Sequence, residues 1–121
     1  MGALLQELLT ELSPLLSRFE KYLDSLDPDI LEEVSNGLIS IGSSFYPSFT
    51  AIRHGVLSAV IYEAGMRLKY RAFELRTRKL VKGDLEYFKD IYELLRRIAN
   101  DISSGEYEKG LRRMHERRKN G

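Results

Sequence analysis

The sequence predicts an all-α protein: a bundle of four main helices with a long central third helix and a short C-terminal helix or basic tail. Apolar residues recur at spacings of three and four along nearly every segment, which is typical of amphipathic helices. The sequence contains neither the alternation expected of strands nor an internal repeat. Its 121 residues suit one domain over 1–121, in which 112–121 could be a frayed basic tail.

The first predicted helix carries a leucine-rich stripe near the N-terminus. The apolar residues of the stripe are Leu5, Leu8, Leu12, Leu15, Phe19, Tyr22 and Leu26. Ser13-Pro14 falls inside this pattern, and proline removes a hydrogen bond from a helix interior. We therefore expect either a kink at this point, or a short helix that ends near Leu12 and a second one with Ser13 as its N-cap.

Asp27-Pro28 predicts the start of the second helix, because Asp is a favoured N-cap and proline fits the first helical position. Gly42-Ser43-Ser44 is expected to end this helix. Pro47-Ser48 then marks the start of the third helix, which would run from about Ser48 to Val81 and end at Lys82-Gly83. At ~1.5 Å per residue, the third helix would be on the order of 45–50 Å long.

Two apolar stripes run along the predicted third helix, on different faces. One holds Leu57, Ile61, Ala64, Leu68, Ala72 and Leu75. The other holds Ala51, Gly55, Ala59, Tyr62, Met66, Tyr70 and Phe73. A helix at the edge of a small bundle needs only one such stripe, so two indicate a central helix or a subunit interface. The pattern therefore predicts a homo-oligomer or a subunit of a larger assembly.

The C-terminal third of the chain predicts one long helix and one short one. Asp84 is expected to cap the fourth helix, and Ser103-Ser104-Gly105 to end it. One face of this helix carries Leu85, Phe88, Ile91, Leu95, Ile98 and Ile102. The segment that follows has few apolar residues, so we expect a short helix that frays into a basic tail.

Residues 34–52 contain no charged side chain, although 31% of the chain is Asp, Glu, Lys or Arg. Five serines and Pro47 make this stretch too polar and too broken to span a membrane. Its aromatic residues Phe45, Tyr46 and Phe49 either staple the second helix to the third, with Tyr46 left exposed, or meet a partner chain. The predicted partner interface comprises Phe45, Tyr46, Phe49, Tyr62, Met66, Tyr70 and Phe73.

Charge is divided unevenly along the chain. Residues 1–52 hold eight acidic and two basic side chains, and the remaining residues hold seventeen basic and ten acidic ones. The predicted nucleic-acid-binding residues are Arg67, Arg71, Arg78 and Lys82 on the third helix, with Arg112, Arg113, Arg117, Arg118 and Lys119 in the tail. Cations repeated along a surface suit the phosphates of RNA or DNA. A solvated face that complements the acidic half, or an acidic protein partner, would explain the same pattern.

Signatures of catalysis are missing from the sequence, which has no glycine-rich phosphate loop, no cysteine and no metalloprotease histidine pair. Arg112 and His115, three residues apart, are the one hint of a ribonuclease-like site, and His54 fits a half-exposed helix position. We expect a non-enzymatic helical subunit that binds nucleic acid, without metal, cofactor or small-molecule substrate. The alternative is a protein–protein interaction module that forms a homo-oligomer and has no nucleic-acid role.

The composition also suggests where the protein works. The absence of cysteine favours a reducing compartment, and the N-terminus lacks the basic region of a signal peptide. A cytoplasmic protein without membrane association is therefore expected. Few amide side chains and many charged ones are a pattern found in thermophiles.

Overall fold

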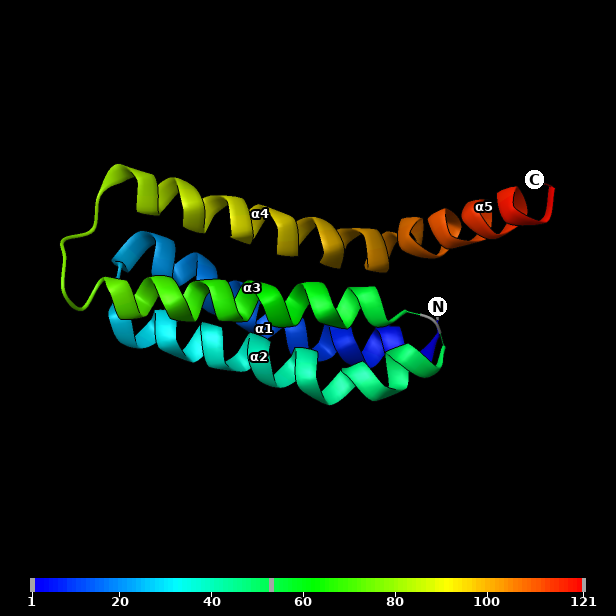
Figure 1. Ribbon diagram of the computed structural model, residues 1–121, viewed down its shortest axis with the longest axis horizontal. Coiled ribbons are helices and arrows are strands. Elements are labelled where there is room, and N and C mark those ends of the chain that lie inside the picture. The colour runs from blue at the N-terminus through cyan, green and yellow to red at the C-terminus, as the bar shows by residue number, and fades with distance from the viewer. Residues whose placement is uncertain (1, 53, 121) are drawn as a thin grey trace.

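Five helices make up the computed structural model, which describes residues 2–52 and 54–120, with side chains as far as residue 113. They are α1 (Ala3–Ser25), α2 (Pro28–Ala51), α3 (Gly55–Glu74), α4 (Lys82–Ser104) and α5 (Glu106–Asn120). The first four helices form the bundle, and α5 projects from one end of it (Figure 1). This arrangement confirms the predicted all-α bundle with a short C-terminal helix.

The hydrophobic core is shared by the four bundle helices, each of which packs against two others. α1 packs against both α2 and α4. Tyr22 of α1 meets Phe88 of α4 edge to face, with ring centroids 5.3 Å apart, and Phe19 meets Tyr92 in the same way at 5.5 Å. These rings join the first and fourth helices across more than sixty residues of chain.

α1 runs through Ser13-Pro14 as one continuous helix, so the predicted break at this point is wrong. Pro14 is exposed, while Leu12 before it is fully buried. A proline in a helix interior costs about 3 kcal/mol. Burial of apolar side chains on both sides of Pro14, Leu8 and Leu12 before it and Phe19 after it, offsets this cost, because each such side chain contributes about 1.5–3 kcal/mol.

The boundary between α2 and α3 lies later in the chain than predicted. α2 continues through Gly42-Ser43-Ser44 and Pro47 to Ala51. The expected helix from 48 to 81 is therefore wrong at both ends, because α3 begins at Gly55 and ends at Glu74. Phe45 and Phe49 explain the extension: both are buried, and their rings lie 5.6 Å apart one turn from each other on the core face of α2.

α2 and α3 form the most extensive helix pair in the molecule, and two glycines allow their close approach. A Cβ atom added at Gly42 would lie 2.6 Å from the Cβ of Tyr62, and one added at Gly65 would lie 2.8 Å from the backbone nitrogen of Ile39. Both distances are too short for any other residue type. The glycines therefore belong to a helix contact and do not mark turns.

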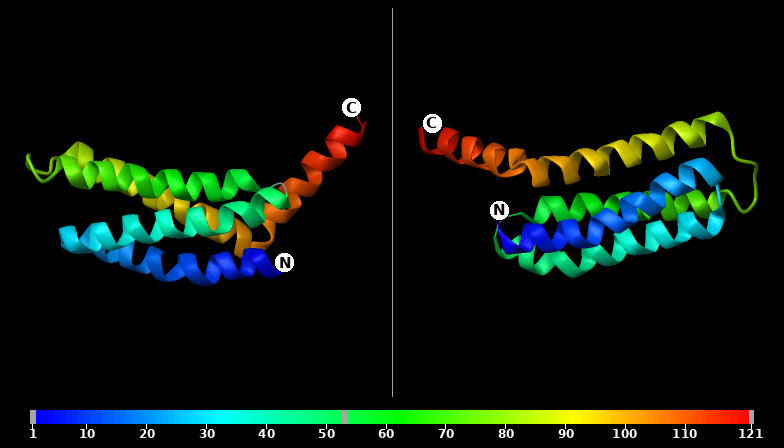
Figure 2. Two further views of the ribbon diagram at one scale, coloured as in Figure 1. Left: turned by 60° about the horizontal axis from the view of Figure 1, so that its bottom comes forward. Right: turned by 180° about the vertical axis from the view of Figure 1, so that it is seen from behind.

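The last two helices are joined as the sequence indicates. Gly105 follows α4 in the left-handed conformation, with φ of 83°, and its N–H donates to the carbonyl of Ile102. Gly83, predicted to end the third helix, instead lies in the first turn of α4. Both further views show α5 leaving the bundle at the end where the N-terminus lies (Figure 2).

Candidate interaction surface

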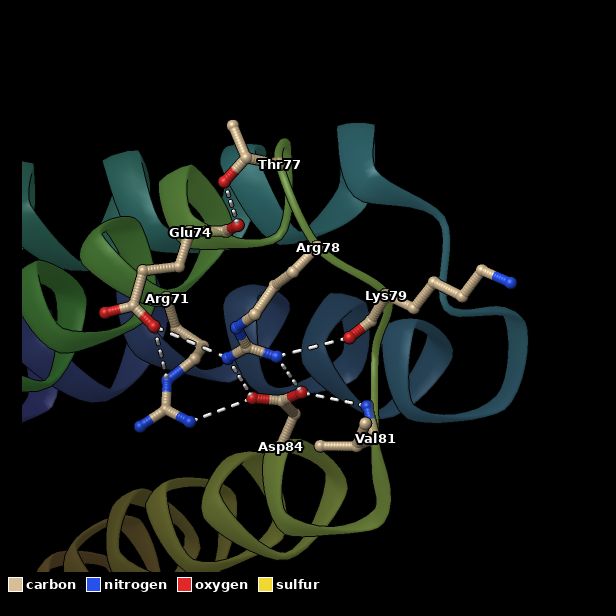
Figure 3. Close-up of polar contacts among 7 residues, drawn as sticks. All are labelled: Arg71, Glu74, Thr77, Arg78, Lys79, Val81 and Asp84. Carbon is tan, nitrogen blue, oxygen red and sulfur yellow. Dashed lines mark hydrogen bonds and ion pairs between the residues drawn. The ribbon is translucent and has the colours of Figure 1, made fainter.

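Asp84 is the one charged side chain that is fully buried among the described residues, at 1% exposure. Its Oδ1 accepts hydrogen bonds from Arg71 at 2.8 Å and from Arg78 at 2.7 Å. Its Oδ2 accepts from a second Arg78 nitrogen at 2.8 Å and from the Val81 backbone N–H at 2.9 Å (Figure 3). These three residues and Asp84 are called the Asp84 cluster below.

The Asp84 cluster joins the end of α3, the connecting segment 75–81 and the start of α4. Bidentate bonds from Arg78, then the Val81 N–H, then Arg71, hold the pKa of Asp84 far below its ordinary range. Asp84 was predicted as the N-cap of the fourth helix, but the helix starts at Lys82 and Asp84 occupies its third position. There its carboxylate receives the N–H of Val81, the residue that precedes the helix.

The predicted stripe of cations does not lie on one helix, because α3 ends at Glu74. Arg78 therefore belongs to the connecting segment and Lys82 to α4. Arg71 is only 26% exposed and also stacks over the ring of Tyr87, 4.0 Å from its centre. Two of the predicted phosphate ligands, Arg71 and Arg78, are therefore already paired with the buried carboxylate of Asp84.

The other predicted cations fall into two groups. Arg67, Lys82 and Arg112 each lie beside a glutamate of their own helix, at 2.6, 3.8 and 3.9 Å respectively. Arg113 is exposed and has no ion pair with the described residues. The side chains of Arg117, Arg118 and Lys119 lie outside the described residues.

The second apolar stripe of α3 is exposed along the helix. Tyr62, Tyr70 and Phe73 are 41%, 64% and 67% exposed. Ala59 is also exposed, and Gly55 and Met66 are half-buried. We call Gly55, Ala59, Tyr62, Met66, Tyr70 and Phe73 the aromatic face. Ala51 does not belong to it, because α2 ends at that residue.

Two different borders flank the aromatic face. On one side lies α2, since Tyr62 contacts Gly42 and the Lys69 ammonium donates to the Asn36 side chain at 3.1 Å. On the other side runs a charged row that contains Glu63 and Arg67, one turn before the Arg71 that reaches α4. The face is therefore an apolar strip between a polar helix edge and a row of ion pairs.

The aromatic residues of α2 are divided between core and surface. Phe45 and Phe49 are 7% and 0% exposed, which places them in the core of the chain and not on a partner surface. Tyr46 between them is 50% exposed, as the stapled alternative requires. Tyr46 follows Gly42 by one turn and so extends the aromatic face onto α2.

A hollow of about 330 Å³ lies at the end of the aromatic face. Its lining includes Tyr22, Leu31, Leu75 and Phe73. Lys69 and Arg76 also belong to its lining. The periodicity of the sequence gave no sign of this hollow, because it forms where the connection between α1 and α2 meets the end of α3.

The two histidines of the sequence lie far apart in the chain. His54 precedes α3 at the helix break, and its Nδ1 is buried without a hydrogen-bond partner in the described part of the chain. The rings of Phe49 and Tyr107 lie beside it, with centroids 6.5 and 5.6 Å away. No set of three or more His, Cys, Asp and Glu in the described ranges could hold a metal ion. The side chain of His115 lies outside those ranges.

None of the described helices is both long enough and apolar enough to cross a membrane. A scan against protein-family models, a search of curated proteins and a search of solved structures found no match to this chain.

Proposed function

We propose that this protein is a protein–protein interaction module that self-associates through the aromatic face. The observation that carries the proposal is the exposure of Tyr62, Tyr70 and Phe73, between 41% and 67%, in one strip along α3. Burial of a large apolar side chain stabilises an interface by about 1.5–3 kcal/mol. Contiguous exposed apolar patches mark interaction sites on folded proteins.

Binding to RNA or DNA remains the second candidate, but the fold gives it less support than the charge pattern alone. The Asp84 cluster already occupies Arg71 and Arg78. Exposed cations such as Arg76 and Arg113 are the ones left for phosphate contacts. A phosphate-binding surface would respond steeply to salt, whereas an apolar interface would hardly respond.

Light scattering over a wide range of protein concentrations, at two salt concentrations, tests the proposed function. The wild-type protein should form an oligomer that is insensitive to salt. Tyr70→Glu should give a folded monomer by circular dichroism, because the charge would have to be buried in the interface. Leu94→Glu is the matched control, since Leu94 is a 42% exposed apolar residue on α4 and should leave the oligomer intact. A wild-type protein that stays monomeric throughout would refute the proposal.

The nucleic-acid alternative needs variants that spare the fold. Arg71→Gln and Arg78→Gln would unpair buried Asp84, so a loss of binding in these variants would not identify a phosphate contact. Arg112→Gln combined with Arg113→Gln changes only exposed side chains on α5. Oligonucleotide binding that is steeply salt-dependent and is lost in this double variant would favour the nucleic-acid role.

A further inference from the structure

The geometry points to a specific occupant of the aromatic face: a second copy of this chain, with its α3 antiparallel to the first and related to it by a two-fold axis near the middle of the helix. This inference rests on the proposed function and adds the partner's orientation. Three observations support it: the distribution of side-chain size along the face, the charges beside it, and its width.

Side-chain size changes along the aromatic face from one end of α3 to the other. The smallest residues, Gly55 and Ala59, lie at the N-terminal end, and the large rings of Tyr70 and Phe73 lie at the C-terminal end. An antiparallel copy brings Gly55 opposite Phe73 and Ala59 opposite Tyr70. A parallel copy would set ring against ring at one end and leave a gap at the other, which the dense packing of protein interfaces disfavours.

The middle of the face also suits an antiparallel copy. Tyr62 and Met66 lie on either side of the midpoint of α3. Across the two-fold axis, Tyr62 of each copy would therefore contact Met66 of the other. Contact of a methionine sulfur with an aromatic ring contributes about 0.3–1.5 kcal/mol. In a parallel pair, Tyr62 would face Tyr62 and Met66 would face Met66, and this contact would be lost.

The charged row beside the face discriminates between the two orientations in the same way. Glu63 and Arg67 form an exposed ion pair within one chain, with 60% and 57% of their side chains exposed. They lie on the same flank, on either side of the midpoint of α3. An antiparallel copy places Glu63 near Arg67 of the second copy, twice by symmetry. In a parallel pair with a two-fold axis along the helices, the charged row of each copy would instead lie beside the α2 border of the other copy, and this pairing of Glu63 with Arg67 would be lost.

The width of the surface is adequate only if α2 takes part. The strip on α3 is ~30 Å long and one helix, ~10 Å, wide. That gives an area on the order of 300 Å², below the ~800 Å² per partner of a standard interface. Ile39 and Tyr46 lie three residues before and four after Gly42, so they widen the strip onto α2. The α2 and α3 helices of two copies would then pack as a four-helix layer of roughly twice this area, ~600 Å² per partner, which is the lower end of the range for stable interfaces.

Cysteine crosslinking tests the orientation, because the chain contains no cysteine of its own. Ala59→Cys and Tyr70→Cys are prepared separately, one of them with a tag that changes its mass, and treated with a short bismaleimide singly and as a mixture. Leu94→Cys is the control for chance encounters between exposed thiols. Light scattering on each variant shows which of them still associate. If Tyr70→Cys does not associate, Phe73→Cys replaces it in the mixture with Ala59→Cys.

In the antiparallel arrangement, the mixture should give mixed dimers at least about tenfold faster than either variant alone, because the two thiols are held at high effective concentration. Same-variant dimers from each protein alone, and no preference in the mixture, would show a parallel pair and overturn this inference while the proposed function stands. A wild-type protein that is monomeric by light scattering would overturn both.

Discussion

Asp84 shows how a single carboxylate can determine the boundary between two helices. Its carboxylate is buried and accepts charge-assisted hydrogen bonds from Arg71 and Arg78. It also accepts a hydrogen bond from the Val81 N–H. A buried ionised group is tolerated when its partners replace the water that it loses. The residues that seemed the best phosphate ligands are therefore needed for the junction between α3 and α4.

Asp84→Asn should lower the free energy of unfolding by about 1.5–3 kcal/mol, the value of hydrogen bonds to a charged group. The amide keeps the shape of the side chain but loses the ionic partner of both arginines. Urea denaturation followed by circular dichroism measures the change. Asp90→Asn, on an exposed position of the same helix, is the control and should be neutral. Equal stability of the two variants would contradict the role assigned to Asp84.

The stability that Asp84 supplies should depend on pH. Its pKa is lower in the folded protein than its ordinary value of 3.8, because Arg78, Val81 and Arg71 donate to the carboxylate. The contribution is therefore complete above pH 4 and decreases as the pH falls below that value. Unfolding measured from pH 7 to pH 2 should show wild-type protein and Asp84→Asn converging at acid pH. Parallel curves would exclude this linkage.

Tyr22 should give the opposite dependence at high pH. Burial, with a smaller effect of the Asp84 charge, raises the pKa of Tyr22 from 10.0 to about 12. A raised pKa in the folded state means that its contribution to stability is complete below pH 10 and is lost as the pH rises towards 12. Tyr22→Phe should remove this part of the alkaline decline in stability. Because Tyr92 and Tyr107 also have raised pKa values, the measured quantity is the difference between the two proteins.

At the scale of helices, the contact between α2 and α3 depends on backbones that approach closely at Gly42 and Gly65. Ser35 and Ser58, both fully buried, continue the same seam, and each hydroxyl donates to a backbone carbonyl of its own helix. Small side chains here keep one edge of α3 against α2, while the rings of the aromatic face turn outward. The seam thus decides which side of α3 is left for a partner.

Gly65→Ala should destabilise the protein by about 1–3 kcal/mol, the usual cost of overpacking. The added methyl group would collide with the backbone nitrogen of Ile39, which cannot move away as a side-chain end could. Gly83→Ala is the matched control: it lies in a helix with open space around it and should raise stability by up to about 1 kcal/mol. Thermal denaturation of both variants would reject the seam if Gly65→Ala were neutral.

Local chemistry in the sequence predicted some helix ends correctly and others wrongly. Asp27 accepts from the Asp29 N–H at 2.9 Å, and Gly105 takes the left-handed conformation, so signals based on one hydrogen bond or one backbone angle held. Pro14 and Pro47 failed as signals, because burial of neighbouring apolar residues outweighs the cost of an interior proline. The end of α3 was missed, since the Asp84 cluster depends on contacts between helices that periodicity does not encode.

The predicted aromatic stripe lies on one helix face from Gly55 onward, whereas the predicted basic stripe does not, and the difference has a physical reason. An apolar stripe requires only the helical period, which holds over Gly55–Glu74. The basic stripe would be continuous only if the same helix reached Lys82. α3 ends at Glu74, eight residues before Lys82, so the cations lie on separate segments.

For the molecule as a whole, self-association should make thermal stability depend on concentration. A ligand or partner that binds only the folded state raises the melting temperature by mass action. Wild-type protein should therefore melt at a higher temperature as its concentration increases, and Tyr70→Glu should melt at a constant temperature. Differential scanning calorimetry at several concentrations measures both. A melting temperature independent of concentration in the wild-type protein would argue against association.

The direction in which α5 leaves the bundle has a consequence for valency. α5 is ~22 Å long and, by its sequence, holds six basic and three acidic side chains. It extends past the end of the bundle where α3 begins (Figure 2). Two copies paired with antiparallel α3 helices would therefore carry their α5 helices at opposite poles, one bundle length apart. If α5 binds polyanions, one long enough to span both poles would be held bivalently, with its second contact made at high effective concentration, whereas a shorter one would be held at a single pole. Such a pair would select its acidic ligands by length.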